Sequence, residues 1–327
     1  MSQENEKKRR PSAGGEEPRH PKKRPQPQGH ERKQHVTGDA QRLQHPQRPK
    51  SQTAGKKRGK NTKKNENVQG KKKKHTVSNI ILVVAIIVFI ASAVQLVRSF
   101  LPYFEGGAEY DDLKELVIRQ EAAEEMEEKS AAAHFLVDFN QLKQINPDTV
   151  AWIRFDEPSV ISYPVVQGKD NKKYLTATFQ ANDNKLGAIF EDFEGSPDFT
   201  DRNTFIYGHN LKIGGEMFSQ LKNYEDQEFY KSYPYFYLYT PDGKVKTYQI
   251  FSAGVVKDVA ENYRKTYTSD EDFAAYLQIC KKSSLYDTGV SVESTDKIVS
   301  LSTCTNVKED ERFLVQGVLI REETVEE

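Results

Sequence analysis

The chain has 327 residues, with 48 Lys and Arg against 48 Asp and Glu, and so carries no formal net charge. This neutral total describes neither part of the chain, because residues 1–76 hold 23 basic against 7 acidic residues and residues 77–327 hold 25 against 41. The split excludes one uniform environment for the whole chain, and we expect the two parts to lie in different surroundings.

The basic part comes first. Residues 1–74 are rich in Lys, Arg, Gln, Pro, Gly and Asn and contain no Ile, Phe or Trp. They bury too little apolar surface to offset chain entropy, so we predict a disordered tail over residues 1–76. Its charge would suit nucleic acid, but next to a membrane span, attraction to anionic lipid at about 1 kcal/mol per cation is the simpler interpretation. No nucleic-acid partner is therefore expected. The tail histidines lack the spacing of a metal site: His20, His30, His35 and His45.

A membrane span is predicted over residues 77–97, VSNIILVVAIIVFIASAVQLV, which contain no charge. At 1.5 Å per residue, 21 helical residues cover a hydrocarbon core of about 30 Å. A buried core helix is the first alternative, although a soluble helix normally keeps a polar face. A cleaved signal peptide is the second, because residues 91–93 (ASA) have the spacing of a cleavage site. The long basic region before the span favours a retained anchor.

The charges at the two ends of the span predict its orientation. The 20 residues before it contain nine Lys and Arg, whereas the 20 after it contain only Arg98 and Lys114. The positive-inside rule places the N-terminus in the cytoplasm and the rest of the chain outside the cell. We therefore expect a single-pass protein of the cell membrane.

The segment that follows, residues 98–134, is predicted to be an acidic helical stalk. Gly106-Gly107 are expected to break the chain, and an acidic helix should follow them. Few apolar residues repeat at helical spacing here, so little core is expected.

Residues 135–327 are long enough for one sizeable core. Short apolar runs alternate with turn signals, which predicts a β-barrel or sandwich with interposed helices. TPDGK at 240–244 is a strong turn that should join two strands into a hairpin. Helices are expected over residues 138–146 and 268–283, the second beginning with Thr268 and Glu271 as a capping box. The expected strands cover residues 150–155, 162–167, 186–192, 203–209, 235–240, 246–256, 297–304 and 312–320.

Two cysteines occur in the chain, and they differ in setting. An extracellular chain could join Cys280 to Cys304 as a disulfide. However, Cys280 lies on the apolar side of a predicted helix and is interpreted as a small buried hydrophobic residue. Cys304 ends a predicted strand among Ser and Thr residues, where functional side chains often gather.

A base and a cation are available for such a thiol. His209 ends the segment NTFIYGH, and a core or turn histidine is the alternative there; His134 lies in an alanine-rich stretch and suits catalysis less. Arg312 opens the last predicted strand and either pairs with the neighbouring acidic residues 309–311 or stabilises charge beside Cys304. Such stabilisation needs a partly desolvated cleft, because opposite charges 4 Å apart attract by about 4 kcal/mol at a dielectric of 20 but about 1 in water.

This pattern resembles the sortases, membrane-anchored cysteine transpeptidases of Gram-positive bacteria, and most closely their class B. The resemblance covers residues 135–320. Five segments carry it in order: DFNQLKQINPDTVAWIRF, ISYPVVQGKDNKKYL, LGAIFEDF, NTFIYGHNLKIGGEMFSQL, and LSTC with ERFLVQGVL. It implies a mainly β fold, a closed barrel of about eight strands with added N-terminal helices. A further helix between strands six and seven would contain residues 272–283.

The resemblance also implies a mechanism. Cys304 would be the nucleophile, His209 the general acid/base, and Arg312 the group that holds the substrate and its oxyanion. The enzyme would cleave a C-terminal sorting signal after threonine, form a thioester on Cys304, and pass the acyl group to an amine of peptidoglycan precursor or of a pilin. No cofactor or metal is expected.

Further residues are matched to the substrate groove. Asn171 and Leu175 fit a DNxxYL-type segment, while Ser302 and Thr303 directly precede the cysteine. The chain departs from its relatives at residues 305–306, Thr-Asn, where an aromatic or acidic residue is frequent. Two other functions remain open: a hydrolytic cysteine peptidase with the same triad, and an inactive membrane-anchored binding module.

Overall fold

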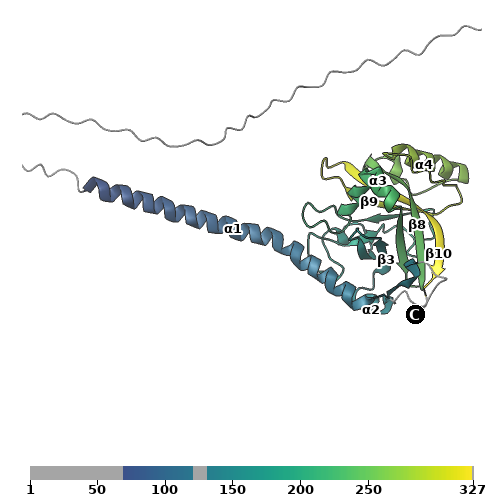
Figure 1. Cartoon of the computed structure of the whole chain (residues 1–327), viewed down its shortest axis with the longest axis horizontal. Helices are drawn as coiled ribbons and strands as arrows, with labels where there is room; N and C mark the ends of the chain where they lie inside the picture. The colour runs from purple at the N-terminus through teal and green to yellow at the C-terminus, as the bar shows by residue number, and fades with distance from the viewer. Residues whose placement is uncertain (1–68, 121–130, 326–327) are drawn as a thin grey trace, which may run out of the picture. The chain divides into compact units, whose positions relative to one another are not determined.

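The computed structural model describes residues 69–120 and 131–325, so most of the predicted basic tail lies outside the described residues. Eight strands close into a barrel in the order β10-β8-β7-β3-β4-β5-β6-β9. Figure 1 labels β3, β8, β9 and β10 of this barrel. All eight predicted strand segments form barrel strands, and the barrel is confirmed over the sandwich. The strands are β3 (Thr149–Phe155), β4 (Ser162–Gln167), β5 (Ile189–Glu191), β6 (Asn203–Tyr207), β7 (Tyr235–Thr240), β8 (Lys244–Lys257), β9 (Ile298–Cys304) and β10 (Glu311–Thr324).

Helices and a small ribbon surround the barrel. The α-helices are α1 (Gln69–Val117), α2 (Phe139–Ile145), α3 (Gln227–Ser232) and α4 (Asp270–Ser283). The 3₁₀ helices are η1 (Ala131–His134), η2 (Lys173–Leu175), η3 (Ser219–Glu225) and η4 (Glu261–Tyr263). A two-stranded antiparallel ribbon joins β1 (Ile118–Gln120) to β2 (Phe135–Val137).

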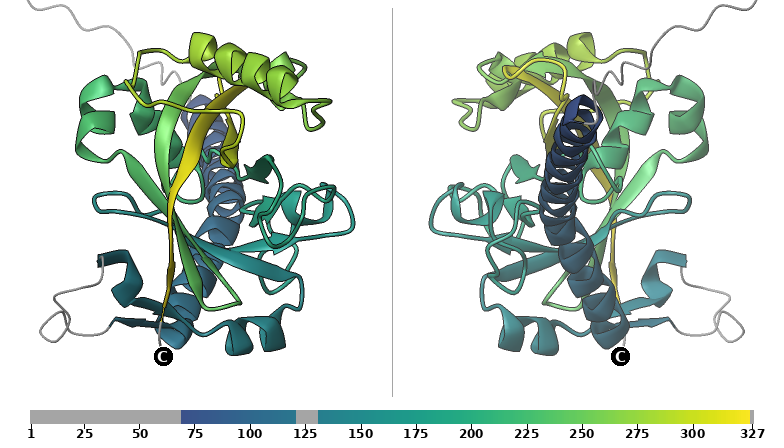
Figure 2. Two further views of the ribbon diagram at one scale, coloured as in Figure 1. Left: turned by 90° about the vertical axis from the view of Figure 1, so that its right-hand side faces the viewer. Right: turned by 90° about the vertical axis from the view of Figure 1, so that its left-hand side faces the viewer.

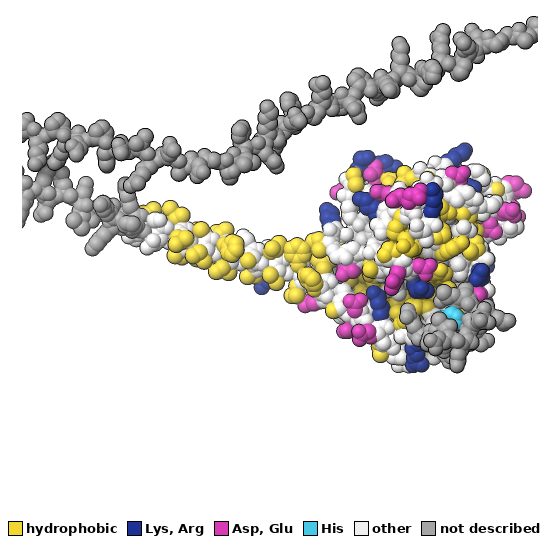
Figure 3. Space-filling view, viewed as in Figure 1, with side chains coloured by type: hydrophobic (Ala, Val, Ile, Leu, Met, Phe, Trp, Pro, Cys, Tyr) yellow, Lys and Arg dark blue, Asp and Glu magenta, His cyan; other side chains and the backbone are white. Residues whose placement is uncertain are grey.

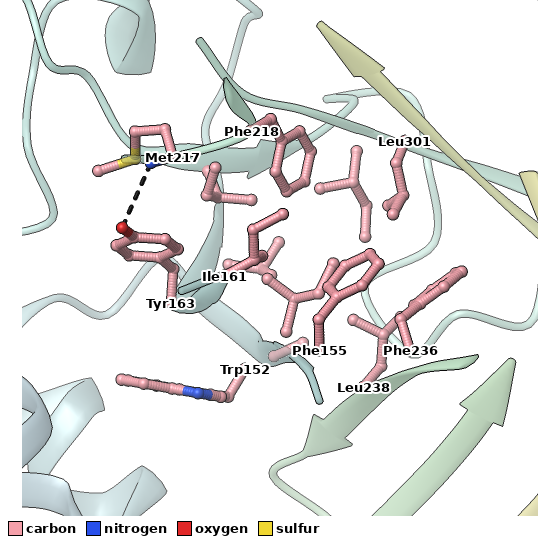
Figure 4. Close-up of a cluster of buried hydrophobic side chains, with 14 of the residues drawn as sticks. Trp152, Phe155, Ile161, Tyr163, Met217, Phe218, Phe236, Leu238 and Leu301 are labelled. Carbon is pink, nitrogen blue, oxygen red and sulfur yellow. Dashed lines mark hydrogen bonds between the residues drawn. The ribbon is translucent and has the colours of Figure 1, made fainter. Parts of the chain in front are cut away.

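The barrel interior is filled by apolar side chains that come from several strands. Phe155 on β3 and Phe236 on β7 stack with ring centres 5.4 Å apart, and Leu301 on β9 belongs to the same buried cluster (Figure 4). Full burial of such a side chain contributes roughly 2 kcal/mol. At the edge of this cluster the Met217 backbone N–H donates a hydrogen bond to the Tyr163 hydroxyl at 3.3 Å. Packing of this kind gives the site a rigid support.

The predicted helix between the sixth and seventh barrel strands is α4. It buries Phe273, Leu277 and Cys280 against a second apolar cluster that includes Phe251 of β8. Its predicted capping box is wrong by one residue. The cap is Ser269, whose hydroxyl accepts the Asp272 N–H at 3.2 Å. The Asp272 carboxylate in turn accepts a hydrogen bond from the Thr268 N–H. The return hydrogen bond of the capping box is therefore made to the residue before the cap and not to the cap itself.

The predicted break at Gly106-Gly107 is wrong, because α1 continues through both glycines to Val117. Gly106 is needed for close approach: a Cβ there would lie 2.7 Å from a methyl group of Leu186. Tyr110, Leu113 and Val117 are buried at helical spacing, so this part of the expected stalk packs on the barrel (Figure 2).

Hydrogen bonds fasten the same part of α1. The Tyr110 hydroxyl donates to the Gly187 carbonyl at 2.9 Å and accepts the Phe179 N–H at 3.1 Å. The Glu109 carboxylate accepts hydrogen bonds from Thr178 and Asn182, at 3.0 and 2.9 Å. The end of α1 is thus part of the folded domain.

The N-terminal part of α1 is different. Its apolar side chains from Val77 to Val97 are exposed along the helix (Figure 3). Within the described residues, α1 is the helix that is long and apolar enough to cross a membrane.

Candidate functional site

Three neighbouring strands bring three predicted residues to one level of the barrel. β6 and β9 are parallel, with Tyr207 opposite Ser302, so the residues two positions further on, His209 and Cys304, come next along both chains. β9 and β10 are antiparallel, and Arg312 lies directly opposite Cys304. Residues that are far apart in sequence therefore meet at one end of three adjacent strands.

Hydrogen bonds tie the segment after β6 to the end of β9. The Gly208 N–H donates to the Ser302 carbonyl at 3.2 Å, and the Thr303 hydroxyl donates to the Gly208 carbonyl at 2.7 Å. The Asn210 amide donates to the Cys304 carbonyl at 2.8 Å. These bonds fix the backbone on both sides of His209 relative to the cysteine.

The His209 ring is oriented by the last residue of η2. Its Nε2 lies 2.7 Å from the Leu175 carbonyl. Because a carbonyl only accepts, Nε2 carries a proton, and in the neutral ring Nδ1 is then the nitrogen with the lone pair. Gly187 leaves room for the ring, because a Cβ at this position would lie 2.9 Å from His209 Cδ2. Its φ of +66° also favours glycine.

The guanidinium of Arg312 is held by a carboxylate and two carbonyls. Nη2 pairs with Asp258 at 3.2 Å, and Nη1 donates to the carbonyls of Glu309 and Glu311 at 2.5 and 3.0 Å. The alternative pairing with neighbouring acidic side chains is therefore wrong, since the ion pair is formed with Asp258. These contacts use three of the five N–H donors of the guanidinium, and the other two remain for a ligand.

A pocket of about 350 Å³ opens at this end of the barrel. All seven residues predicted for the site line it, together with five that were not predicted. The seven are Asn171, Leu175, His209, Ser302, Thr303, Cys304 and Arg312. The five are Phe190, Tyr207, Gly208, Asp258 and Tyr263. Within residues 69–120 and 131–325, no three His, Cys, Asp or Glu side chains are grouped to hold a metal ion.

Aromatic side chains form part of the pocket wall. The Tyr263 and Ser302 hydroxyls lie 2.6 Å apart, and the Tyr263 ring stacks on Phe205. Burial raises the pKa of Tyr263 to about 12, so this hydroxyl stays protonated. Leu175, which also lines the pocket, is 41% exposed. The pocket therefore combines apolar surface with a few fixed hydrogen-bonding groups, as ligand sites usually do.

The two cysteines are both free, so the alternative of a disulfide between them is wrong. Cys280 is fully buried on α4, as predicted, and burial raises its pKa to about 11. Cys304 is partly exposed in the pocket. Only the second thiol is placed to meet a substrate.

The departure at residues 305–306 has a structural explanation. Asn306 has a φ of +61°, a left-handed conformation that asparagine tolerates better than most residues. Its side-chain amide donates to the Asn210 carbonyl at 2.7 Å. The loop after Cys304 is thus joined to the segment after His209.

Some of the pocket residues that the sequence analysis missed could have been identified from the sequence, and others could not. Tyr207 lies two positions before His209, so strand alternation could have identified it. Asp258 and Tyr263 follow the end of β8 in a segment without periodicity, and nothing in the sequence indicated their return to the pocket. His134, considered the weaker histidine, lies in η1 and does not line this pocket.

Comparisons with known proteins agree with this geometry. A family model described as Sortase domain matches residues 155–320. Sortase B of Listeria monocytogenes is 33% identical over 187 residues, covering 56% of this chain and 74% of that protein. Sortase B of Staphylococcus aureus is 30% identical over 249 residues, covering 75% and 96%. The solved Staphylococcus aureus sortase B–substrate complex has a TM-score of 0.53 and 31% identity, covering 56% of this chain and 84% of that one. The chain therefore belongs to the sortase family, in its class B.

Proposed function

We propose that this chain is a cysteine transpeptidase that cleaves a C-terminal sorting signal after threonine and transfers the acyl group to an amine. The observation that carries the proposal is the register of β6, β9 and β10, which brings Cys304, His209 and Arg312 to one pocket. Sortases are transpeptidases of the cell surface, and the Staphylococcus aureus relative has been solved as a substrate complex.

The first half-reaction forms the thioester. The thiolate of Cys304 attacks the threonine carbonyl carbon, and the carbonyl oxygen becomes an oxyanion. Arg312 stabilises that oxyanion with the two N–H donors that Asp258 and the backbone carbonyls leave available, a contribution typically worth about 3 kcal/mol. The carbon–nitrogen bond then breaks, and Nδ1 of His209 gives its proton to the departing amine.

The second half-reaction releases the product. An acceptor amine attacks the thioester carbonyl, His209 takes a proton from that amine, and the thiolate of Cys304 leaves. A new amide bond forms and the enzyme returns to its first state. The acceptor class that fits the family is a peptidoglycan precursor or a pilin amine, and a sortase B has been solved in complex with triglycine.

The membrane arrangement is part of the proposal. Residues 77–97 of α1 cross the bilayer, the basic tail lies in the cytoplasm, and the barrel lies outside the cell. Surface proteolysis of intact cells should then remove the barrel and spare a tag at residue 1. Loss of the N-terminal tag instead would reverse the orientation.

The chemical test uses a sorting-signal peptide with and without an amine acceptor, with products identified by mass spectrometry. Wild-type protein should form an amide with the acceptor, and Cys304→Ala should form no product. Cys280→Ala is the matched control, because that thiol is free and buried in α4, and it should keep its activity.

Each alternative has its own signature in these measurements. A hydrolytic peptidase would release only free acid even when the acceptor is present. An inactive binding module would release neither product, and its Cys304 would not react with a thiol probe at neutral pH. Undiminished turnover by Cys304→Ala would remove the nucleophile assignment.

A further inference from the structure

One carboxylate outside the pocket connects several parts of its wall. Asp192 directly follows β5 and is 2% exposed. Its Oδ2 accepts hydrogen bonds from Asn171 Nδ2 at 3.0 Å and the Tyr207 hydroxyl at 2.9 Å, and Lys265 Nζ lies 2.6 Å away. Its Oδ1 accepts the Glu194 N–H at 3.0 Å. A buried charge is tolerated because all its partners are donors.

The three side-chain donors come from three separate segments of the chain. Asn171 precedes η2, Tyr207 ends β6, and both line the pocket. Lys265 lies two residues after Tyr263, which also lines the pocket. Burial alone would raise the pKa of Asp192, but the hydrogen bonds from Lys265, the Glu194 amide and Tyr207 outweigh it and hold that pKa below its usual range.

The same contacts fix the orientation of the Asn171 amide. Its Nδ2 donates to Asp192, while its Oδ1 accepts the Phe193 N–H at 3.0 Å. The oxygen and nitrogen of the amide therefore have assigned directions. One N–H of Asn171 remains for the groove, and Asp192 determines where it points.

We propose that Asp192 is a positioning residue, which holds the groove walls carrying Asn171, Tyr207 and Tyr263 in the arrangement that binds the sorting signal. The inference rests on the proposed function and deepens it. Asp192 does not line the pocket and acts through the residues it holds. Lys265 is a partly exposed cation that joins the segment after η4 to the segment after β5, and its Nζ also pairs with Glu194 at 2.9 Å.

The reacting residues are held by other bonds. Cys304 and His209 depend on contacts made by Thr303, Asn210 and Leu175, none of which involves Asp192. Loss of the Asp192 charge should therefore weaken substrate binding more than it slows the chemistry. A variant that merely destabilised the fold would not separate KM from kcat in this way.

The test measures KM and kcat for the sorting-signal peptide in full-length protein. Asp192→Asn keeps the shape and removes the charge, and it should raise KM at least tenfold with kcat within about threefold of wild type. Lys265→Met should also raise KM, whereas Lys265→Arg keeps a cation and should restore it. The double variant Asp192→Asn with Lys265→Met should be no worse than Asp192→Asn alone, because both changes break one pair.

Lys246→Met is the matched control. It removes another partly buried ion pair, Lys246–Glu322 at 2.8 Å, whose lysine side chain is 8% exposed. Lys246 lies ten residues along β8 from Val256, the residue opposite Arg312. At 3.3 Å per residue this separation corresponds to about 33 Å. Its KM should stay within twofold of wild type. An equal rise in the control, or an unchanged KM in Asp192→Asn, overturns the proposal.

A second readout needs no turnover. Amide hydrogen exchange of residues 171–173 and 263–267 should become faster in Asp192→Asn than in Lys246→Met. If wild-type protein processes no sorting-signal peptide, the proposed function fails, and exchange alone decides the positioning role. Faster exchange in both segments then supports that role, and unchanged exchange overturns it.

Discussion

The carboxyl group of Glu191, the last residue of β5, is fully buried, and neither oxygen has a hydrogen-bond partner among the described residues. Burial, together with the nearby carboxylates of Asp201, Asp192 and Asp198, raises its pKa from 4.5 to about 9. The Tyr248 phenol of β8 is a further titratable neighbour. At neutral pH the folded protein therefore holds a proton on Glu191 that the unfolded chain releases.

The linkage between this proton and folding gives a magnitude. Between pH 4.5 and 9 the folded state binds one more proton than the unfolded state, so stability falls by about 1.4 kcal/mol for each pH unit. The contribution is fully present below pH 4.5 and is lost as pH rises toward 9. At pH 7 the cost is roughly 3 kcal/mol. Glu191→Gln has the same shape without the titration, so its stability relative to wild type should rise by about 4 kcal/mol from pH 5 to pH 8.

Denaturant unfolding of detergent-solubilised protein, followed by circular dichroism from pH 5 to pH 8, measures this difference. Glu225→Gln is the control, because that side chain is exposed on η3 and its removal should leave the slope against pH unchanged. Parallel curves for wild type and Glu191→Gln would refute the reasoning, because they would mean that Glu191 is ionised in the folded protein.

Three further substitutions test contacts around the pocket. Asp258→Asn should lower kcat/KM about two- to fivefold, because it loosens Arg312 and a half-exposed ion pair is worth under about 1 kcal/mol. A rise in kcat/KM would mean that the carboxylate competes with the substrate for the guanidinium. Tyr110→Phe leaves a buried N–H and the Gly187 carbonyl unpaired and should lower the unfolding free energy by about 1–3 kcal/mol, measured with urea; an unchanged midpoint would contradict this. Gly187→Ala places a methyl group against the His209 ring and should lower kcat at least tenfold, and normal turnover would show that the ring can shift.

Much of the barrel could be predicted because its strands obey local rules. The run from Lys297 to Cys304 is apolar and β-branched, and TPDGK contains the residues that a tight turn needs. The pairing of the strands is not determined locally. β9 lies between β6 and β10 because of the way the whole sheet closes, and no local sequence pattern indicates this. The grouping of Cys304 with His209 was therefore inferred from their residue types, from their places at the ends of predicted strands and from the resemblance, and not from their spacing in the sequence.

The parts that were missed depend on contacts distant in sequence. In α1 the acidic residues around Tyr110 and Leu113 conceal the buried face, and two glycines suggested a break where close packing needs one of them. Nothing in the sequence around Asp258 distinguishes it from other acidic residues. Its contact with Arg312 becomes apparent only in the fold, where the pairing of β8 with β10 brings the two residues together.

Because α1 is unbroken, it sets the distance between the end of the proposed span and the barrel. From Val97, where the proposed span ends, to Tyr110, where the helix is fastened to the barrel, the chain rises by about 20 Å at 1.5 Å per residue. With the span in the bilayer, a helix of this length acts as a spacer and not as a tether. Donor and acceptor would then have to present their reacting groups within a narrow layer above the lipid surface, so lengthening this spacer by whole turns should select for different reaction partners.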